Sequence, residues 1–332
     1  MSAAPLLEVA RLGVDFLTPR GPVHALRDVD LAVPRGGAVG IVGESGSGKS
    51  TLIAAAMRLL PDNAAIRTGR IGFEGSDVLA LRGRALRDLR GRRIAMVFQD
   101  PMTALNPVLT IGRQMTDIQY RDRISGRARR ARAAEMLRRV GIPDAASRLA
   151  AYPHQFSGGM RQRICIAMAL LGAPALLIAD EPTTALDVTT EAQIIHLLRA
   201  LQAGSGTALL FISHNLGLVA ELAETVVILY AGEVVERGPV RAIFHDARHP
   251  YTQALLVCDP ALVAAPEGDG AAPPLPTIGG EPPDLRHIPG GCIFAARCPR
   301  RIPRCLAERP ALRRIAPGHE AACHLAMPDA TA

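Results

Sequence analysis

The hydrophobic pattern of the chain alternates between short apolar runs and longer amphipathic stretches. Apolar runs at 6–16 and 29–33 flank a Pro/Gly turn at 18–22 and predict two strands. Uninterrupted apolar runs predict buried strands at 38–42, 94–98, 175–179, 208–213 and 226–230. Amphipathic stretches predict helices at 50–60, 111–140, 159–171 and 191–202. Strands that alternate with helices in this way favour an α/β fold with a mainly parallel sheet.

Composition divides the chain near residue 240. A chain of 332 residues suggests two domains, which we expect at 1–240 and 241–332. In the second domain, the stretch 261–289 is rich in Pro, Gly and Ala and is typical of a linker. Four of the six cysteines follow this linker.

Charge and hydropathy narrow the class of protein. The net charge of +7 is compatible with nucleic acid, with an anionic membrane surface, or with arginine as the general surface cation. The arginines within 111–140 likewise indicate a solvated helix face or, alternatively, a contact with a membrane or partner. Aromatic residues make up 3% and tryptophan is absent, so a stacking platform for single-stranded nucleic acid is missing. We expect no nucleic-acid partner.

The chain shows no targeting or membrane-spanning segment. Residues 1–8 have no feature of a secretory signal. The longest uncharged apolar run, 164–179, is short for a membrane span and contains Pro174. We therefore expect a cytosolic protein, with any membrane spans supplied by other chains.

A single lysine, Lys49, occurs in the whole chain, and it lies in a glycine-rich motif. This motif fits the phosphate-loop pattern G-x-x-x-x-G-K-[ST] and consists of Gly43, Glu44, Ser45, Gly46, Ser47, Gly48, Lys49, Ser50 and Thr51. Its glycines let successive backbone N–H groups face phosphate oxygens at the start of a helix. The compact ammonium of Lys49 suits a position between the β and γ phosphates better than a planar guanidinium does. The hydroxyl of Ser50 is expected to hold Mg²⁺, and the motif predicts a nucleotide-binding protein.

The strand predicted at 175–179 ends in two carboxylates, Asp180 and Glu181. On their own they would be an acidic turn after a strand. Together with the phosphate loop they predict a hydrolysis site, with Asp180 near Mg²⁺ and Glu181 polarising the attacking water.

A third motif, Ser157-Gly158-Gly159, opens a predicted helix and provides a second helix N-terminus suited to anions. In combination with the phosphate loop before it and the two carboxylates after it, the motif resembles the L-S-G-G-Q signature of the ATP-binding-cassette (ABC) ATPases. Phe156 and Met160 replace the outer positions of that signature. The departure is mild, because the inner three residues contact phosphate in the family.

The resemblance covers roughly 6–238 and implies a fold. In the family this is an α/β P-loop NTPase cassette with a RecA-like core, an antiparallel β subdomain and an α-helical subdomain, here at about 100–165. A small Cys-rich extension would follow the cassette.

The resemblance also implies further site residues. Gln99 matches the Q-loop glutamine, which senses Mg²⁺ and the membrane partner. Asp187, within the stretch 185–187, matches the D-loop, and His214 matches the switch histidine that contacts the γ-phosphate. Phe16 matches the aromatic that stacks on adenine, with a core strand position as the alternative. His24 is a weaker candidate near the base.

Other stretches resemble one branch of this family, the oligopeptide/dipeptide importer ATPases. They are 99–107, 152–155 and 249–256, together with the cysteine-bearing C-terminal extension. We therefore expect an ATPase that powers the import of dipeptides or oligopeptides. Importers for nickel or another small solute share this type of ATPase and are the alternative.

The four cysteines of the extension, Cys292, Cys298, Cys305 and Cys323, have the spacing C-x5-C-x6-C-x17-C. Disulfides are rare in the cytosol, so clustered thiols indicate a metal. Zinc sites usually contain a C-x2-4-C pair, which is missing here, whereas four thiolates suit a [4Fe–4S] cluster. The resemblance also favours iron–sulfur, because some dipeptide-importer ATPases carry such a cluster in this region. Zinc and unligated thiols are the alternatives.

The resemblance implies an assembly as well. In the family two cassettes pack head to tail, so ATP would lie between Lys49 of one chain and Ser157 of the other. We expect a second, homologous ATPase chain in a heterodimer and two integral membrane permease subunits. An extracytoplasmic peptide-binding protein would act indirectly. The chain would be peripheral, at the cytoplasmic face of the inner membrane.

Two other classes fit the motifs less well. ABC ATPases that act on DNA insert coiled coils or zinc modules before the signature, and too few residues separate Gln99 from Ser157 for that. Those that split ribosomes have two cassettes and an N-terminal cluster in one chain, and this sequence has neither. A P-loop kinase or GTPase would not explain the Ser157-Gly158-Gly159 motif or His214.

Overall fold

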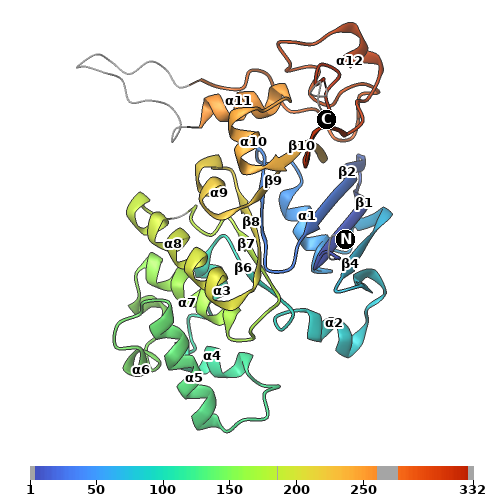
Figure 1. The fold of residues 1–332 in the computed structure, drawn as a ribbon. Helices are drawn as coiled ribbons and strands as arrows, with labels where there is room; N and C mark the ends of the chain where they lie inside the picture. The colour runs from blue at the N-terminus through green and yellow to red at the C-terminus, as the bar shows by residue number, and fades with distance from the viewer. Residues whose placement is uncertain (1–3, 185, 260–275, 328–332) are drawn as a thin grey trace, which may run out of the picture. The chain divides into compact units, whose positions relative to one another are not determined.

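The computed structural model describes residues 4–184, 186–259 and 276–327 (Figure 1). The chain forms two compact units. Unit 1 consists of residues 1–33, 38–79 and 212–332, and unit 2 consists of residues 34–37 and 80–211. Each unit is described separately below.

Unit 1 contains a four-stranded antiparallel sheet, drawn in blue in Figure 1. Its strands, in the order β2-β1-β4-β5, are β1 (Leu7–Thr18), β2 (Gly21–Val33), β4 (Ala64–Phe73) and β5 (Ser76–Asp77). The predicted strand at 29–33 was too short, because β2 begins at Gly21, which pairs with Thr18. The ladder to β1 holds residues 21–28 in the sheet although several of their side chains are exposed or half-buried. This sheet confirms the predicted antiparallel subdomain.

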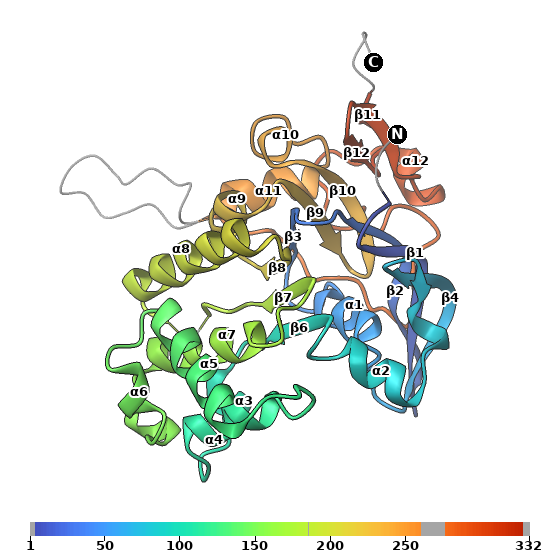
Figure 2. The same cartoon turned by 60° about the horizontal axis from the view of Figure 1, so that its bottom comes forward.

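A second sheet in unit 1 has the order β11-β12-β10-β9-β3. Its strands are β3 (Ala38–Val42), β9 (Thr225–Tyr230), β10 (Glu233–Pro239), β11 (Arg313–Ala316) and β12 (His319–Ala321). The predicted parallel arrangement holds for β3 and β9, whereas β10, β11 and β12 add to it in antiparallel pairs. The helices of the unit are α1 (Lys49–Ala56), α9 (Leu216–Leu222), α10 (Val240–His245), α11 (Pro250–Cys258) and α12 (Pro303–Ala307). Figure 2 shows α12 beside the hairpin of β11 and β12.

A buried polar junction attaches this hairpin to the sheet. Glu236 of β10 is fully buried and accepts the backbone N–H groups of Arg248 and His249 at 2.7 and 3.0 Å. The carboxylate also lies 2.8 Å from Nε2 of His319 in β12. Burial lowers the pKa of His249 to about 4, so this imidazole is neutral at neutral pH, and its Nδ1 accepts the N–H of Tyr251. Paired in this way, the buried carboxylate avoids the large cost of an isolated buried charge.

Unit 2 contains three strands in the order β8-β7-β6, with β6 and β7 parallel. They are β6 (Ile94–Val97), β7 (Leu176–Asp180) and β8 (Ala208–Ser213), the last of which continues beyond the unit at residue 211. The helices are α2 (Gly83–Leu89), α3 (Pro101–Ala104), α4 (Ile111–Ile118), α5 (Gly126–Arg139), α6 (Ala145–Arg148), α7 (Gly158–Leu170) and α8 (Val188–Ser205). Two 3₁₀ turns complete the described elements: η1 (Val78–Ala80), which begins in unit 1, and η2 (Pro153–Gln155), which lies in unit 2.

The prediction of one helix at 111–140 was wrong, because the segment forms α4 and α5. Ser125 is the N-cap of α5, where its Oγ accepts the N–H of Ala128. A serine in that position favours a helix start over a helix interior. The guanidinium of Arg129 donates to the carbonyl oxygen of Asp122 at 3.0 Å and closes the loop before the cap.

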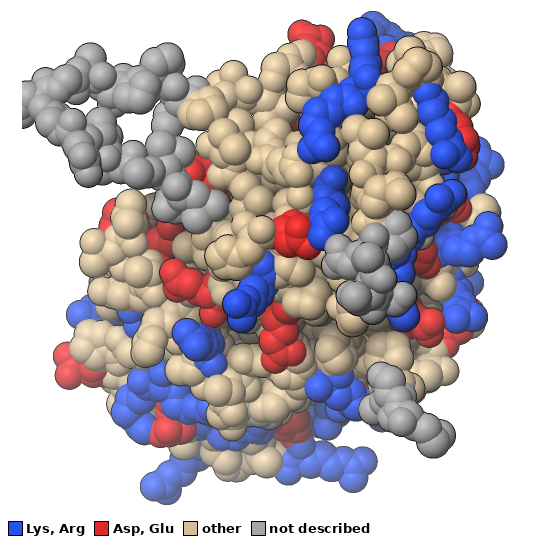
Figure 3. Space-filling view, turned by 45° about the horizontal axis from the view of Figure 1, so that its top comes forward, with Lys and Arg blue, Asp and Glu red and all other residues tan. Residues whose placement is uncertain are grey.

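Arginines adjoin acidic side chains at several points on the face shown in Figure 3. In unit 1, ion pairs join Arg237 to Glu320 and Arg309 to Asp28, each in contact with solvent. Such exposed pairs contribute about 1 kcal/mol or less. No helix in the described part of the chain is long and apolar enough to cross a bilayer.

Candidate nucleotide site

The glycine-rich motif forms the loop between β3 and α1 in unit 1. All of β3 is buried, and α1 begins at Lys49 with Gly48 as its N-cap. A Cβ on Gly43 would lie 2.1 Å from the carbonyl oxygen of Leu229, and one on Gly48 would lie 2.9 Å from that of Ala25. Gly48 also has a φ of 104°, which residues other than glycine rarely adopt. The loop therefore follows one backbone path, closely packed against β9 and β2.

The polar groups of this loop fit a nucleotide phosphate with Mg²⁺. Lys49 is buried, and its Nζ donates to the carbonyl oxygens of Gly43 and Glu44 at 2.7 and 3.0 Å. The Oγ of Ser47 is buried and has no hydrogen-bond partner among the described residues. Leaving a buried hydroxyl without a hydrogen bond costs free energy, so this hydroxyl is suited to a bound group that supplies the hydrogen bond. Ser50 is exposed in the first turn of α1, where its hydroxyl is accessible to a cation.

Three more candidate residues lie in unit 1. Phe16 is half-buried in β1, between Val23 of β2 and Ala64 of β4, and so keeps part of its ring accessible. His24 lies with its Nδ1 2.8 Å from the carboxylate of Asp15, which gives it a structural partner. His214 is exposed directly after β8.

The carboxylates predicted for hydrolysis lie at the end of β7 in unit 2. Asp180 is the last residue of the strand, and Glu181 follows it with a φ of 44°. A glutamate in this left-handed region is strained, and such strain is concentrated at functional sites. Nε2 of Gln99 donates to the Glu181 carboxylate at 3.3 Å, and Oγ1 of Thr184 donates to it at 3.0 Å. Unit 2 thus brings Gln99 and Glu181 together.

The Ser157-Gly158-Gly159 motif lies at the start of α7. Ser157 is the N-cap, and its Oγ accepts the N–H of Met160 at 3.4 Å. A Cβ on Gly159 would lie 2.4 Å from Cγ2 of Thr190, so the helix start packs directly on α8. Asp187, the N-cap of α8, accepts both the N–H and the hydroxyl of Thr190, and these bonds lower the pKa of Asp187.

The predicted residues are divided between the two units. Unit 1 carries the phosphate loop, Phe16 and His214, and unit 2 carries Gln99, the Ser157-Gly158-Gly159 motif, Asp180, Glu181 and Asp187. Ala185 of the predicted D-loop and residues 261–275 of the predicted linker lie outside the described residues.

Sequence reasoning missed two residues that contact the phosphate loop. They are Tyr251 and Arg297, and both bind Glu44. Tyr251 lies in the stretch 249–256, which was noticed only for its resemblance. Arg297 belongs to no recognised motif, and the sequence does not distinguish it from the many other arginines.

The four cysteines of the extension lie near one another in unit 1. Burial raises the pKa of Cys292 to about 11 and raises the pKa values of Cys298 and Cys323, with a further contribution from neighbouring thiols of the group. In the described segments, however, no three His, Cys, Asp or Glu side chains are arranged to hold a metal ion. The predicted iron–sulfur cluster at Cys292, Cys298, Cys305 and Cys323, and its zinc alternative, therefore have no support from the side-chain arrangement.

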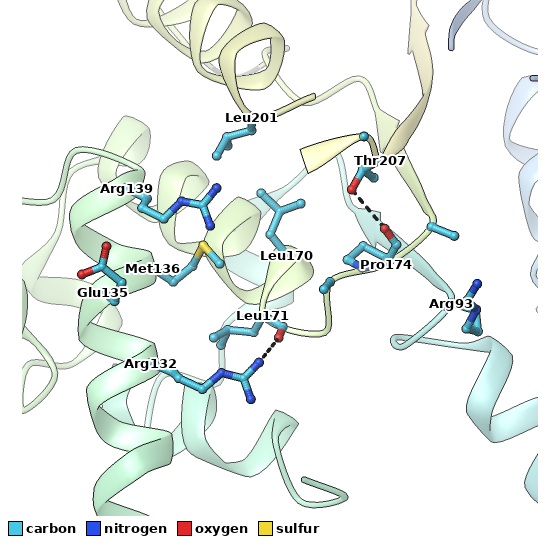
Figure 4. Close-up of a pocket in the computed structure, with 13 residues that line it drawn as sticks. Arg93, Arg132, Glu135, Met136, Arg139, Leu170, Leu171, Pro174, Leu201 and Thr207 are labelled. Carbon is cyan, nitrogen blue, oxygen red and sulfur yellow. Dashed lines mark hydrogen bonds between the residues drawn. The ribbon is translucent and has the colours of Figure 1, made fainter. Parts of the chain in front are cut away.

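A separate hollow of about 460 Å³ in unit 2 contains none of the predicted site residues. Figure 4 shows Arg132 and Arg139 of α5 on one side of it and Leu170, Leu171 and Pro174 on another. Arg132 is already paired, since it donates to the carbonyl oxygen of Leu171 and to Asp122. Arg132 alone therefore does not make this hollow an anion site.

The fold and the phosphate loop define a P-loop cassette, and comparison with known families agrees. Residues 26–184 match the family described as ABC transporter. Residues 235–305 match the family described as Oligopeptide/dipeptide transporter, C-terminal region.

Curated relatives match nearly the whole chain. The dipeptide transport ATP-binding protein DppD of Escherichia coli is 47% identical over 98% of this chain and 98% of that protein. The oligopeptide transport ATP-binding protein OppD of Bacillus subtilis is 45% identical over 98% of this chain and 90% of that protein.

Solved structures match the cassette. A dimeric, post-hydrolysis structure of the ATP-binding cassette MJ0796 bound to ADP and Pi has a TM-score of 0.63 and 29% identity, and covers 71% of this chain and 99% of that one. The cbiO1 protein of Clostridium perfringens, part of the ABC transporter complex cbiONQ, has a TM-score of 0.64 and 27% identity over 73% of this chain and 92% of that one. The chain belongs to the ABC transporter family of ATP-binding proteins and is an ATPase, so the predicted family and fold class are confirmed.

The close contact between α7 and α8 predicts that a side chain at Gly159 destabilises the protein. Gly159→Ala should lower the melting temperature by several degrees, because the new methyl group overlaps Cγ2 of Thr190 and overpacking costs about 1–3 kcal/mol. Adding Thr190→Ser removes that Cγ2, keeps the hydroxyl for Asp187, and should restore most of the loss. Gly158→Ala is the control, since its Cβ would meet only Leu186 at 3.8 Å. Equal melting temperatures for the two alanine variants would contradict this account.

Proposed function

We propose that this protein is the ATP-hydrolysing subunit of a membrane importer for dipeptides or oligopeptides. The observation that carries the proposal is the 45–47% identity, over nearly the full length, to proteins named for dipeptide and oligopeptide transport. The match to the oligopeptide/dipeptide C-terminal region supports the same branch.

The residues of the phosphate loop bind and orient the nucleotide. The loop N–H groups and the Lys49 ammonium neutralise and hold the phosphates, and Phe16 stacks on the base. Ser50, Gln99 and Asp180 would hold Mg²⁺. When bound, Mg²⁺ neutralises charge that develops on the phosphate oxygens.

Glu181 orients the attacking water and accepts its proton, and His214 steadies the γ-phosphate. The hydrogen bonds from Gln99 and Thr184 restrict the Glu181 side chain. A movement of Gln99 would therefore shift the carboxylate that orients the attacking water. This supports a role for Gln99 in linking partner binding to hydrolysis.

The second half of the site comes from another chain in this proposal. Ser157, Gly158 and Gly159 of one ATPase meet the nucleotide held by Lys49 of the other, and Asp187 lies beside that signature. The dimeric state of the related MJ0796 cassette bound to ADP and Pi supports such an arrangement. A homologous but different ATPase chain is the proposed partner, which makes the pair a heterodimer.

A surface near Gln99 suits the membrane subunits. Large apolar side chains are exposed there, including Phe98 at 48%, Met102 at 60% and Val108 at 75%. Phe98 also lines a small hollow of about 220 Å³, together with Met96 and Ile118. Exposed apolar groups of this kind mark interaction sites. We propose that a cytosolic helix of one of the two permease subunits docks here, which places the protein at the cytoplasmic face of the inner membrane as a peripheral subunit.

The importer assignment is tested by purification from membranes. The tagged, full-length protein should co-purify with a homologous ATPase and two integral membrane proteins, and the reconstituted complex with its peptide-binding protein should take up labelled dipeptides when ATP is added. Phe98→Asp should reduce recovery of the membrane subunits, whereas Val257→Asp, at an exposed position on α11, should not. Uptake of nickel but not of peptides would contradict the assigned substrate class.

The assignment of Glu181 is tested by Glu181→Gln in the assembled complex. We expect ATP binding to persist and phosphate release to fall at least ~100-fold, because the amide cannot accept a proton from water. The ATPase dimer should then stay closed in the presence of ATP, as seen by size-exclusion chromatography. Glu135→Gln, at an exposed glutamate of unit 2, serves as the control. Normal hydrolysis by the Glu181 variant would overturn the assignment.

We also propose that Cys292, Cys298, Cys305 and Cys323 bind a [4Fe–4S] cluster. The support is chemical, since four thiolates suit this group. Protein purified without oxygen should contain iron and acid-labile sulfide in equal amounts and be brown. Cys305→Ser should lose both, while Cys165→Ser, at a buried cysteine of unit 2, should keep both. Zinc without iron would contradict the proposal.

A further inference from the structure

Within unit 1 the C-terminal extension reaches the phosphate loop through Arg297. The guanidinium donates to both carboxylate oxygens of Glu44, from Nη1 at 2.7 Å and from Nη2 at 3.0 Å. Two parallel charged hydrogen bonds of this kind are stronger and more directional than neutral ones. The Arg297 side chain is 4% exposed and that of Glu44 is 28% exposed, so solvent screens the pair far less than a surface ion pair.

Every nitrogen of the Arg297 guanidinium has a protein acceptor. Nε donates to the carbonyl oxygen of Gly279 at 3.0 Å, Nη2 to that of Ile278 at 3.0 Å, and Nη1 to the Tyr230 hydroxyl at 3.3 Å. The guanidinium carbon also lies 5.7 Å from the centre of the Tyr230 ring. A lysine has no planar fork with which to satisfy these acceptors together. The side chain is therefore held in one position, with Glu44 as its charged partner.

The backbone of Glu44 is held from the same side. Its N–H donates to the hydroxyl of Tyr251 at 2.9 Å, and Tyr251 is fully buried. The Tyr251 ring packs against Tyr230 and Phe294, with ring centres 4.5 and 5.4 Å away. The carbonyl oxygen of Glu44 in turn accepts from Nζ of Lys49 at 3.0 Å. One residue of the loop thus connects Arg297 and Tyr251 to the catalytic lysine.

We propose that Arg297 is a positioning residue of the ATP site, which holds the phosphate loop in its binding conformation through Glu44. The proposal rests on the proposed role of that loop in binding ATP. A loop held in place before the ligand arrives loses less conformational entropy on binding, so the clamp strengthens nucleotide affinity without touching the nucleotide. The extension thereby becomes part of the ATPase site, in addition to any role of its cysteines.

The test is Arg297→Gln in the full-length protein, with ATP–Mg²⁺ affinity measured by equilibrium binding. We expect about tenfold weaker binding, since the charged pair and its orientation are lost. In the assembled complex, KM for ATP should rise with little change in kcat, because Arg297 contacts neither the reacting phosphate nor the water. Arg297→Lys should recover only part of the affinity. A merely structural role would lower the melting temperature without this split between KM and kcat.

Arg304→Gln is the matched control. Like Arg297, Arg304 directly precedes a cysteine of the extension, but it is exposed and pairs with Glu308 rather than with the loop. Its ATP affinity should equal that of the wild type. Equal loss in both variants would attribute the effect to the extension in general and overturn the proposal.

A double-mutant cycle keeps the test independent of folding defects in one variant. Glu44→Gln is nearly isosteric and should weaken ATP binding by a similar factor, and the double variant should be no weaker than either single one, because both remove the same interaction. Additive losses, or wild-type affinity in Arg297→Gln, would refute the clamp. Lys49→Ala distinguishes failure of the Arg297 clamp from failure of the proposed nucleotide site. If Lys49→Ala binds ATP as well as the wild type does, the loop itself is not the nucleotide site.

Discussion

The path of the phosphate loop is the constraint on which the rest of the site depends. A loop binds phosphate with its backbone only if that backbone is fixed, and here it is fixed by close approach to two neighbouring strands. Gly43 lies against the carbonyl oxygen of Leu229, and Gly48 lies against that of Ala25. No side chain fits at either place. The buried strand β3 and the start of α1 then determine where Lys49 and Ser50 lie, so the chemistry of the loop follows from sterics at two glycines.

The candidate residues of unit 2 are restrained in a different way, through strain and side-chain hydrogen bonds. Glu181 has a positive φ, which costs of order 1–3 kcal/mol and needs support from its surroundings. Gln99 and Thr184 provide part of that support by donating to its carboxylate. Of the signature glycines, Gly159 is required by the close approach of Thr190 rather than by its own backbone angles.

Motifs with a fixed local geometry could be predicted from the sequence, and contacts between distant segments could not. The buried strands β3, β7 and β8 are continuous apolar runs, and the loop and its lysine form a recognisable pattern, so both were correctly anticipated. The prediction of one helix at 111–140 overlooked Ser125, whose preference for the N-cap position separates α5 from α4. The pairing of Arg297 with Glu44 was missed for a physical reason. It joins residues 253 positions apart, and nothing in the local sequence distinguishes an arginine that is buried from one on the surface.

The use of a single lysine among so many arginines has a consistent explanation in the contacts of the two side chains. Two arginines of unit 1 lie where several acceptors surround one cation. Arg309 donates to the carboxylates of Glu233 and Asp28, and Arg297 binds one carboxylate, two carbonyl oxygens and a hydroxyl. Planar forks satisfy such sets better than an ammonium does. Lys49 is in a different situation, since its Nζ donates to two carbonyl oxygens of the loop, and a compact ammonium suits such a position better than a planar guanidinium does. The same difference in shape fits the two proposed roles, in which an arginine holds Glu44 from outside the loop and a lysine faces the phosphates.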